Sequence, residues 1–310
     1  MPINVLYAGN PKRWDVYHRE INKALDEIQI EATLSCDLPA DQVDYIVYDP
    51  NSALQDFTPF TRAKAVLGLW AGVERIVYNP TLTQPYARMV DQGLSEGMTE
   101  WVVGHVLRHH LEMDQDIHNT TPAWGRLAPP LARDRRVGIL GLGELGRVCA
   151  KALTDLNFPV SGWSRWVKSI DGVTCLHGDE GLEQVLRNSD ILVLLLPATK
   201  ATENVLNAER IAMLPEGAVI INPGRGPLID DAALLDALDR GHIAHATLDV
   251  FRIEPLPNDD PYWTHPKVTV TPHIASDTRP DTAAKVIAEN IRRGEAKEPF
   301  LHLVDKKAGY

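Results

Sequence analysis

Residues 137–146 read Val137-Gly138-Ile139-Leu140-Gly141-Leu142-Gly143-Glu144-Leu145-Gly146. The apolar beginning predicts a buried strand, and the residues from Leu145 to Leu156 predict a helix. Between the two, Gly141 permits a tight turn, Gly143 lets the backbone approach a pyrophosphate, and Gly146 allows close packing of helix on strand. A second predicted strand begins about 20 residues on, as in dinucleotide-binding units. The alternative, a glycine-rich turn of an unrelated α/β fold, does not account for this strand–turn–helix–strand context.

Further apolar runs alternate with helical patterns along the whole chain. Predicted strands cover residues 3–7, 45–48, 65–69, 158–163, 191–196, 218–222, 246–250 and 268–271, and predicted helices cover residues 14–28, 100–117, 230–238 and 282–293. Strands that alternate with helices indicate parallel sheets covered by helices. A chain of 310 residues is long for one core and comfortable for two. The sequence therefore predicts an α/β fold with two doubly wound parallel-sheet domains.

The composition excludes several classes of protein. With 44% hydrophobic and 24% charged residues, it is typical of a soluble globular protein. The formal net charge of −11 argues against nucleic acid and anionic membranes as partners, although a local arginine can still bind a small anion. No apolar run approaches the length of a membrane span, and we expect no signal peptide. Cys36, Cys149 and Cys175 are few and widely spaced, which fits a reducing cytoplasm.

Three strings after the glycines each carry one polar residue that can act on a carbonyl group. They are Asn222-Pro223-Gly224-Arg225-Gly226, Phe251-Arg252-Ile253-Glu254-Pro255 and Thr271-Pro272-His273-Ile274-Ala275. Arg225 can hold a carboxylate and polarise a carbonyl oxygen, and His273 can donate a proton because histidine titrates near working pH. Glu254 would bond the other ring nitrogen and favour the imidazolium. Singly, these could be an ion pair and a strand cap; together, each at a strand end, they favour hydride transfer to a carbonyl.

The end of the strand at residues 158–163 distinguishes the two nicotinamide cofactors. An acidic residue at that point binds the ribose 2′-hydroxyl of NAD(H). This chain instead has Ser164 and Arg165, with Lys168 close behind. A hydroxyl and a guanidinium suit the 2′-phosphate of NADP(H), and no carboxylate is present to repel it. NADP(H) is therefore preferred and NAD(H) stays possible; the alternative for Arg165 is a surface side chain without a ligand.

With these strings in view, the chain resembles the D-isomer-specific 2-hydroxyacid dehydrogenases over essentially its whole length. The motifs behind the resemblance are the glycine turn, residues 196–202, Asn222–Gly226 with Asp230 after it, Leu248-Asp249-Val250-Phe251 before Glu254-Pro255-Leu256, and Thr271-Pro272-His273. Within the family the chain is most similar to the glyoxylate and hydroxypyruvate reductases. That finer match rests on Trp70-Ala71-Gly72-Val73, Trp163-Ser164-Arg165, Trp263-Thr264-His265-Pro266 and residues 304–310.

The resemblance implies a division of the chain and of its residues. It implies a flavodoxin-like substrate-binding domain, residues 1–97 plus 283–310, and a Rossmann dinucleotide-binding domain, residues 98–282. It also implies a homodimer that reduces small 2-oxo acids to 2-hydroxy acids without a metal, with Arg225, Glu254 and His273 as catalytic residues. The cofactor would contact Gly141, Gly143, Glu144, Leu145, Gly146, Ser164, Arg165, Lys168, Leu196, Pro197, Thr202, Asn222, Pro223, Gly224, Asp249 (at the nicotinamide carboxamide) and Ala275.

The resemblance also implies where the substrate binds. Trp70, Ala71 and Gly72 follow a predicted strand, and their backbone amides would bind the substrate carboxylate. Trp70 is larger than the residue of many relatives, so we expect a reshaped pocket. Tyr48 at another strand end is a further pocket candidate, whose alternative role is packing. Ala275 stands, with the serine after it, where many relatives carry two glycines.

Two other functions stay open. One is an NAD-linked dehydrogenase of a larger D-2-hydroxy acid. The other is a dinucleotide-sensing binding protein, like the corepressors related to this family, although the sequence shows no long low-complexity tail that would favour such a role. His105 and His109 have the i, i+4 spacing of a metal pair. Because no carboxylate or cysteine supports that spacing, we predict surface or helix-packing histidines.

Overall fold

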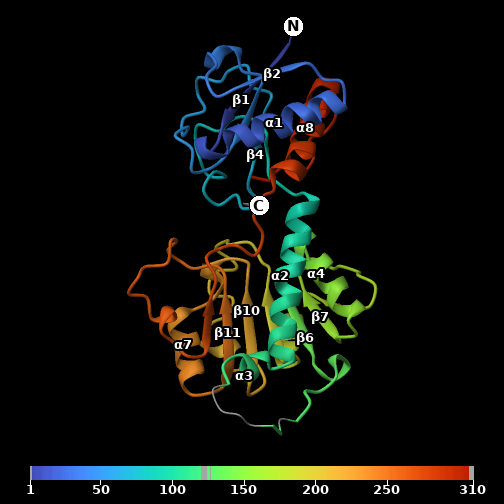
Figure 1. Cartoon of the computed structure of the whole chain (residues 1–310), viewed down its shortest axis with the longest axis vertical. Coiled ribbons are helices and arrows are strands. Elements are labelled where there is room, and N and C mark those ends of the chain that lie inside the picture. Colours follow the sequence, from blue (N-terminus) through green and yellow to red (C-terminus); the bar gives the residue numbers. More distant parts are fainter. Residues whose placement is uncertain (1, 120–123, 126, 307–310) are drawn as a thin grey trace. The chain divides into compact units, whose positions relative to one another are not determined.

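The computed structural model of the chain describes residues 2–119, 124–125 and 127–306. It consists of two compact units (Figure 1). The first unit comprises Met1–Leu94 and Asp277–Tyr310, and the second comprises Ser95–Ser276. Residues 307–310, at the end of the string that begins at residue 304, lie outside the described residues. Each unit is an α/β structure built on a parallel sheet, which confirms the predicted fold class.

The second unit is built on a seven-stranded parallel sheet. Its strands are β6 (Val137–Leu140), β7 (Val160–Trp163), β8 (Val173–Leu176), β9 (Ile191–Leu194), β10 (Ala218–Asn222), β11 (Ile243–Leu248) and β12 (Val268–Val270). Their order is β12-β11-β10-β9-β6-β7-β8, and every pair is parallel. The chain runs outward from β6 on one side and from β9 on the other, so the boundary between them is a topological switch point.

Helices cover both faces of this sheet. On one face, α2 (Gln92–His110) and α4 (Glu144–Asp155) share a core with Ile139 and Val193. Figure 1 shows α2 in front of this sheet, running roughly along the strands. On the other face, α5 (Gly178–Arg187), α6 (Ala208–Ile211) and α7 (Asp231–Asp239) share a core with Leu192 and Leu194. Strand β9 is buried on both faces, which explains its almost purely apolar sequence.

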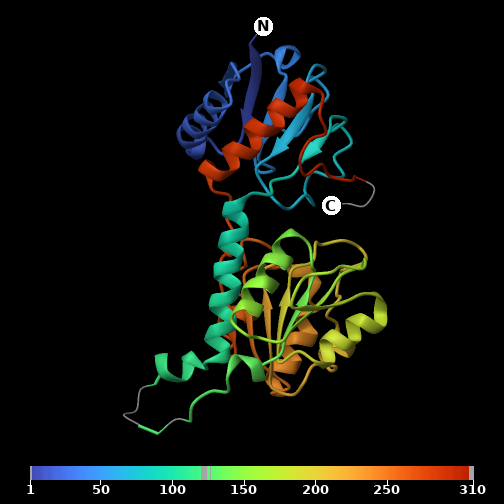
Figure 2. The same cartoon turned by 90° about the vertical axis from the view of Figure 1, so that its right-hand side faces the viewer.

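The first unit has a smaller sheet with the order β2-β1-β3-β4-β5. Its strands are β1 (Ile3–Ala8), β2 (Ala32–Ser35), β3 (Tyr45–Tyr48), β4 (Ala65–Gly68) and β5 (Tyr86–Ala87), all paired in parallel. This is the flavodoxin-like order, with its switch point between β1 and β3. Helices α1 (Trp14–Glu27) and α8 (Pro280–Ala296) pack side by side on one face (Figure 2). Irregular segments that carry Phe57, Phe60 and Ile76 cover the other face.

Three strands and two helices were not predicted, and one predicted helix has a different extent. Strands β2, β5 and β8 were not predicted, because all three lie at sheet edges and lack a long apolar run. Helices α5 and α6 were not predicted either. The predicted helix at residues 100–117 is wrong in its extent: α2 begins at Gln92 and ends at His110, and α3 (Met113–Ile117) follows. Glu112 separates the two helices because it adopts the left-handed conformation, with φ of 53°.

His109 of α2 packs against the sheet, which is the helix-packing role that the sequence allowed. The Nε2 atom of His109 lies 2.8 Å from the hydroxyl of Thr247, and its ring centre lies 4.9 Å from that of His245. His245 in turn contacts the hydroxyl of Thr269 at 2.8 Å. Burial, together with neighbouring positive charge, lowers the pKa of His109 to about 3 and that of His245 to about 4. Both rings are therefore neutral in the folded protein at any pH near neutrality.

This pair predicts a loss of stability in mild acid. Below a pH of about 6.5 both histidines take up protons in the unfolded chain but not in the folded one, so the free energy of unfolding should fall as the pH drops toward 4. The variant His109→Gln keeps a hydrogen-bond partner for Thr247 and should show a shallower fall between pH 6.5 and 4. Thermal melting at several pH values measures this, with the exposed His18→Gln as control. Equal slopes for wild type and His109→Gln would contradict the assignment.

Candidate active site

The candidate site lies along the carboxyl edge of the second unit's sheet. Strands β6, β9, β10, β11 and β12 are successive neighbours, and each is followed by one of the segments singled out in the sequence. In parallel order, the edge carries the glycine turn after β6, Pro197 after β9, Arg225 after β10, Glu254 after β11 and His273 after β12. Ligands bind at this edge of open α/β sheets, next to the switch point.

Glu254 and His273 form a hydrogen-bonded pair. The Nδ1 atom of His273 lies 2.7 Å from Oε2 of Glu254, and the other carboxylate oxygen accepts the amide of Phe251 at 2.9 Å. Burial opposes ionisation of this carboxyl group. This effect of burial is smaller than the stabilisation of the carboxylate by hydrogen bonds from His273 and Phe251 and by the charge of Arg225. The pKa of Glu254 is therefore lowered. The histidine side chain is 47% exposed, which leaves its Nε2 side accessible to a ligand.

Arg225 is held at the tip of a short turn. Asn222, which is 1% exposed, donates from its side-chain amide to the carbonyl of Arg225 at 3.0 Å and accepts the amide of Gly224 at 3.1 Å. The guanidinium donates to the Gly224 carbonyl at 2.6 Å. Pro223 and Gly224 are buried beneath this turn, and Arg225 itself is half-buried. The positive charge of Arg225 also helps to lower the pKa of Glu254, so the two side chains interact electrostatically.

Asp249 fixes the turn that presents His273. Its side chain is fully buried, and its Oδ1 atom accepts the hydroxyl of Thr271 at 2.6 Å and the amide of Ile274 at 2.9 Å. Its Oδ2 atom accepts the amide of Ala275 at 2.9 Å, and its carbonyl accepts the amide of His273 at 2.9 Å. His273 adopts a positive φ of 54°, a conformation that such anchoring maintains. Both carboxylate oxygens of Asp249 thus have donors within the protein, which is the role of a strand-end cap.

The glycine turn has the features that a pyrophosphate requires. Gly141 has a φ of 111°, and a Cβ at Gly146 would overlap the carbonyl of Gly141, so both positions need glycine. A Cβ at Gly143 would meet only open space. Gly143 is the N-cap of α4 and offers no side-chain acceptor to the first-turn amides, which include those of Glu144 and Leu145. Such amides have no acceptor inside the helix, so they are available to an anion.

The remaining predicted cofactor residues border the same edge. After β9, the hydroxyl of Thr202 donates to the carbonyl of Pro197 at 2.6 Å and accepts the amide of Thr199 at 2.8 Å, which shapes the loop that begins at Leu196. After β7, Ser164 is 8% exposed and donates to the carbonyl of Trp166 at 2.7 Å, so it shapes its own loop. The side chains of Arg165 and Lys168 are exposed beside it.

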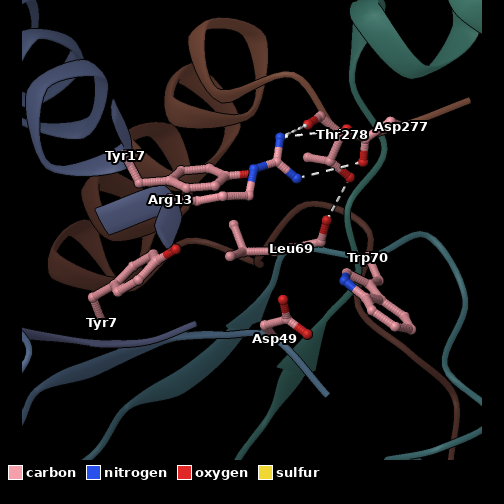
Figure 3. Close-up of a pocket in the computed structure, with 8 residues that line it drawn as sticks. All are labelled: Tyr7, Arg13, Tyr17, Asp49, Leu69, Trp70, Asp277 and Thr278. Atoms are coloured by element: carbon pink, nitrogen blue, oxygen red, sulfur yellow. Dashed lines mark hydrogen bonds and ion pairs between the residues drawn. The ribbon is translucent and has the colours of Figure 1, made fainter. Parts of the chain in front are cut away.

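In the first unit, the Trp70 loop borders a small cavity at the carboxyl ends of β1, β3 and β4 (Figure 3). The cavity is lined by Tyr7, Arg13, Tyr17, Asp49, Leu69, Trp70, Asp277 and Thr278. Thr278 donates to the carbonyl of Leu69 at 2.6 Å, and Arg13 donates to the carbonyl of Thr278 at 2.8 Å. Trp70 is held by the amide of Met89, which donates to its carbonyl at 2.9 Å. Ala71 and Gly72 continue the loop and are half-buried.

Tyr48 does not belong to this cavity. Its side chain is 1% exposed and packs edge-on against Phe57, with ring centres 5.2 Å apart. Its hydroxyl accepts a long hydrogen bond of 3.5 Å from Gln55. The alternative role that the sequence allowed, packing in the core, is the one that this structure supports.

Two residues of the site edge were missed from the sequence. Arg252 lies within the string that contains Glu254, and Asp231 follows Asp230, yet neither was singled out. Arg252 donates from Nε to the carboxylate of Asp231 at 3.1 Å, and Tyr262 donates to the same carboxylate at 2.9 Å. The sequence signal that could have identified Arg252 is its charge two positions before the candidate catalytic residue Glu254. In the part of the chain that the structure describes, no group of histidine, cysteine and acidic side chains could hold a metal ion.

A Rossmann unit with a glycine turn and an Arg, Glu and His set at one edge defines a dinucleotide-dependent oxidoreductase. Comparison with known proteins narrows the class. The family model for "D-isomer specific 2-hydroxyacid dehydrogenase, NAD binding domain" matches residues 101–275. The chain is 40% identical over 255 residues to glyoxylate/hydroxypyruvate reductase A of Photorhabdus laumondii subsp. laumondii, a match that covers 80% of this chain and 82% of the relative. The chain belongs to the D-isomer specific 2-hydroxyacid dehydrogenase family.

Solved structures agree over the whole chain. A D-isomer specific 2-hydroxyacid dehydrogenase from Xanthobacter autotrophicus Py2, in complex with NADPH and MES, superposes with a TM-score of 0.91 at 38% identity and full coverage of both chains. An NADPH-dependent glyoxylate/hydroxypyruvate reductase from Sinorhizobium meliloti, in complex with NADP and sulfate, superposes with a TM-score of 0.82 at 35% identity, covering 100% of this chain and 99% of the other.

Proposed function

We propose that the protein reduces small 2-oxo acids to 2-hydroxy acids with NADPH, and that glyoxylate and hydroxypyruvate are its leading substrates. The observation that carries this proposal is the pair formed by His273 and Glu254, 2.7 Å apart, beside Arg225 at the strand edge next to the glycine turn. The sequence relatives named glyoxylate/hydroxypyruvate reductase A support the choice of substrates.

The geometry supports a division of labour among the three side chains. The bound nicotinamide supplies the hydride. As the carbonyl oxygen of the substrate gains negative charge, Arg225 stabilises that charge and orients the acid, and His273 donates the proton that completes the hydroxyl group. Glu254 holds the Nδ1 side of the ring, which directs Nε2 outward and stabilises the imidazolium before the transfer. In the reverse direction, the neutral ring accepts the proton.

Replacement of His273 tests this function directly. The variant His273→Ala should reduce glyoxylate about 100- to 10,000-fold more slowly than the wild type, because the proton donor is lost. Its affinity for NADPH should stay within about twofold, since the glycine turn is intact. Initial rates on glyoxylate, hydroxypyruvate, pyruvate and phenylpyruvate, with NADPH fluorescence titration, measure both, and the exposed His18→Ala serves as control. A wild type without turnover on this panel would instead favour a dinucleotide-sensing binding protein.

We propose that Arg165 and Lys168 bind the 2′-phosphate and that Ser164 shapes their loop. The exposed basic side chains and the absence of a carboxylate at the end of β7 support this proposal. The bound NADPH and NADP of structural neighbours support it further.

The variant Arg165→Ala should therefore lose affinity for NADPH selectively. A charge-assisted hydrogen bond contributes about 1.5–3 kcal/mol, so KM for NADPH should rise about 10- to 100-fold while KM for NADH changes little. Steady-state kinetics with each cofactor measure the ratio. Arg187→Ala, at an exposed ion pair on α5, is the matched control. Equal or better turnover of the wild type with NADH would support an NAD-linked dehydrogenase instead.

We propose that the backbone amides of Ala71 and Gly72 bind the substrate carboxylate and that Trp70 limits the size of the substrate. The location of their loop at the carboxyl ends of parallel strands supports this assignment. The cation–π contact of Arg75 with Trp70, 5.8 Å from the ring centre, would restrain the indole.

We also propose a homodimer. Large apolar side chains of the segment from α3 to residue 131 are exposed: Ile117 by 66%, Trp124 by 106%, Leu127 by 88% and Leu131 by 59%. A concentration of exposed apolar side chains of this kind marks an interaction site. Sedimentation velocity should give a dimer for the wild type and a monomer for the double variant Trp124→Ser/Leu127→Ser. Trp166→Ser, at another exposed tryptophan, should remain a dimer; a monomeric wild type would overturn the proposal.

We place the protein in the cytoplasm, where its free thiols would stay reduced. Cys36, Cys149 and Cys175 are all free. Among residues 2–119, 124–125 and 127–306, no helix is long and apolar enough to cross a membrane. Fractionation of cells that express the protein checks the location, and recovery from the periplasm would contradict it.

A further inference from the structure

Arg252 connects the loops that carry two of the three candidate catalytic residues. Its Nε atom donates to Oδ2 of Asp231 at 3.1 Å, and its Nη2 atom donates to the carbonyl of Ile229 at 2.6 Å and to the side-chain oxygen of Asn204. Its Nη1 atom lies 3.8 Å from the carboxylate of Glu203. The guanidinium therefore joins its own turn to two other segments of the second unit, residues 203–204 and residues 229–231.

These segments all border the candidate site. Ile229 and Asp231 follow the turn of Arg225, separated from it by one turn of 3-10 helix. Glu203 and Asn204 follow the loop that Thr202 shapes after β9. Arg252 itself lies two residues before Glu254, in the turn whose Phe251 amide donates to the Glu254 carboxylate. A displacement of this turn would therefore move the carboxylate that holds His273.

Packing independently shows that the two turns are closely fitted. A Cβ at Gly226, next to Arg225, would overlap the peptide group that joins Phe251 to Arg252. Asp231, which accepts a hydrogen bond from Arg252, is itself held in place. Its Oδ1 atom accepts the hydroxyl of Tyr262 at 2.9 Å, and Tyr262 is 4% exposed. Burial raises the pKa of Asp231 despite these bonds. The contact of Arg252 is thus with a constrained, partly buried carboxylate and a main-chain carbonyl, unlike an isolated surface ion pair.

We propose that Arg252 is a positioning residue of the reaction: it sets the placement of the Glu254–His273 pair relative to Arg225. The proposal rests on the proposed function. Arg252 does not act on the substrate itself, because its donors bond to groups within the protein. Its planar fork is needed because one ammonium group cannot reach both the Asp231 carboxylate and the Ile229 carbonyl with fixed geometry.

The variants Arg252→Ala and Arg252→Lys test this role in the full-length enzyme. A shift of about 1 Å in a catalytic group can cost about 100-fold, so we expect kcat of Arg252→Ala to fall about 10- to 100-fold. KM for NADPH should stay within twofold, because the glycine turn is intact. Arg252→Lys should give an intermediate kcat. Arg240→Ala, at an exposed ion pair with Asp236 on α7, should match the wild type in both kcat and KM.

Hydrogen–deuterium exchange provides a readout that does not depend on turnover. Exchange of the amide of Phe251 should be at least tenfold faster in Arg252→Ala than in the wild type and unchanged in Arg240→Ala, because Arg252 restrains the turn that places the Glu254 carboxylate. A wild-type kcat in Arg252→Ala, or unchanged exchange at Phe251, would overturn the proposal. If Arg252→Ala fails to fold, the same criteria apply to Arg252→Lys. A wild type without turnover, in contrast, would refute the proposed function, and exchange would still decide whether Arg252 restrains this turn.

Discussion

Parallel pairing of neighbouring strands is the constraint on which the rest of the second unit depends. All strands of a parallel sheet end at the same edge, so the loops after β9, β10, β11 and β12 meet although they are far apart in the sequence. Because β9 is buried on both faces, a shift in its register would break well-fitted packing against helices on either side. The hydrophobic core thereby fixes the strand ends, and these strand ends determine where the loops of Arg225, Glu254 and His273 begin.

Buried polar side chains then fix the conformation of the turns that follow these strand ends. Asn222 and Asp249 are 1% and 0% exposed, and each lies at the end of a strand where the backbone must turn. A buried polar side chain is destabilising unless it is hydrogen-bonded, and both side chains accept hydrogen bonds from backbone amides of the turn itself. Thus the same bonds that satisfy the buried groups also hold the turn of Arg225 and the left-handed backbone of His273.

The fold, the glycine turn and the three candidate catalytic residues could be predicted because they follow from periodicity and from local strings. The contacts of Arg252 could not, because they join loops whose conformations have no periodicity and whose residues lie 21 to 49 positions apart. The burial of Tyr48 depends on Phe57, which lies in an irregular segment across the sheet face. Three of the four edge strands were missed: β2 and β8 are only partly buried and show no continuous apolar pattern, and β5 has only two residues.

The proposed chemistry and the proposed choice of substrate place different demands on the protein. A guanidinium and an imidazole recognise the ketone and carboxylate that every 2-oxo acid shares, so Arg225 and His273 cannot distinguish one acid from another. Discrimination requires contact with the remaining substituent of the substrate. An apolar contact gains only about 1–3 kcal/mol per methylene, which favours large acids modestly. A rigid wall that overlaps a bulky substituent excludes it far more strongly, because protein interiors are close-packed and yield little. A tryptophan restrained by a guanidinium suits that role, which is the physical reason to look to Trp70 for the preference for short acids.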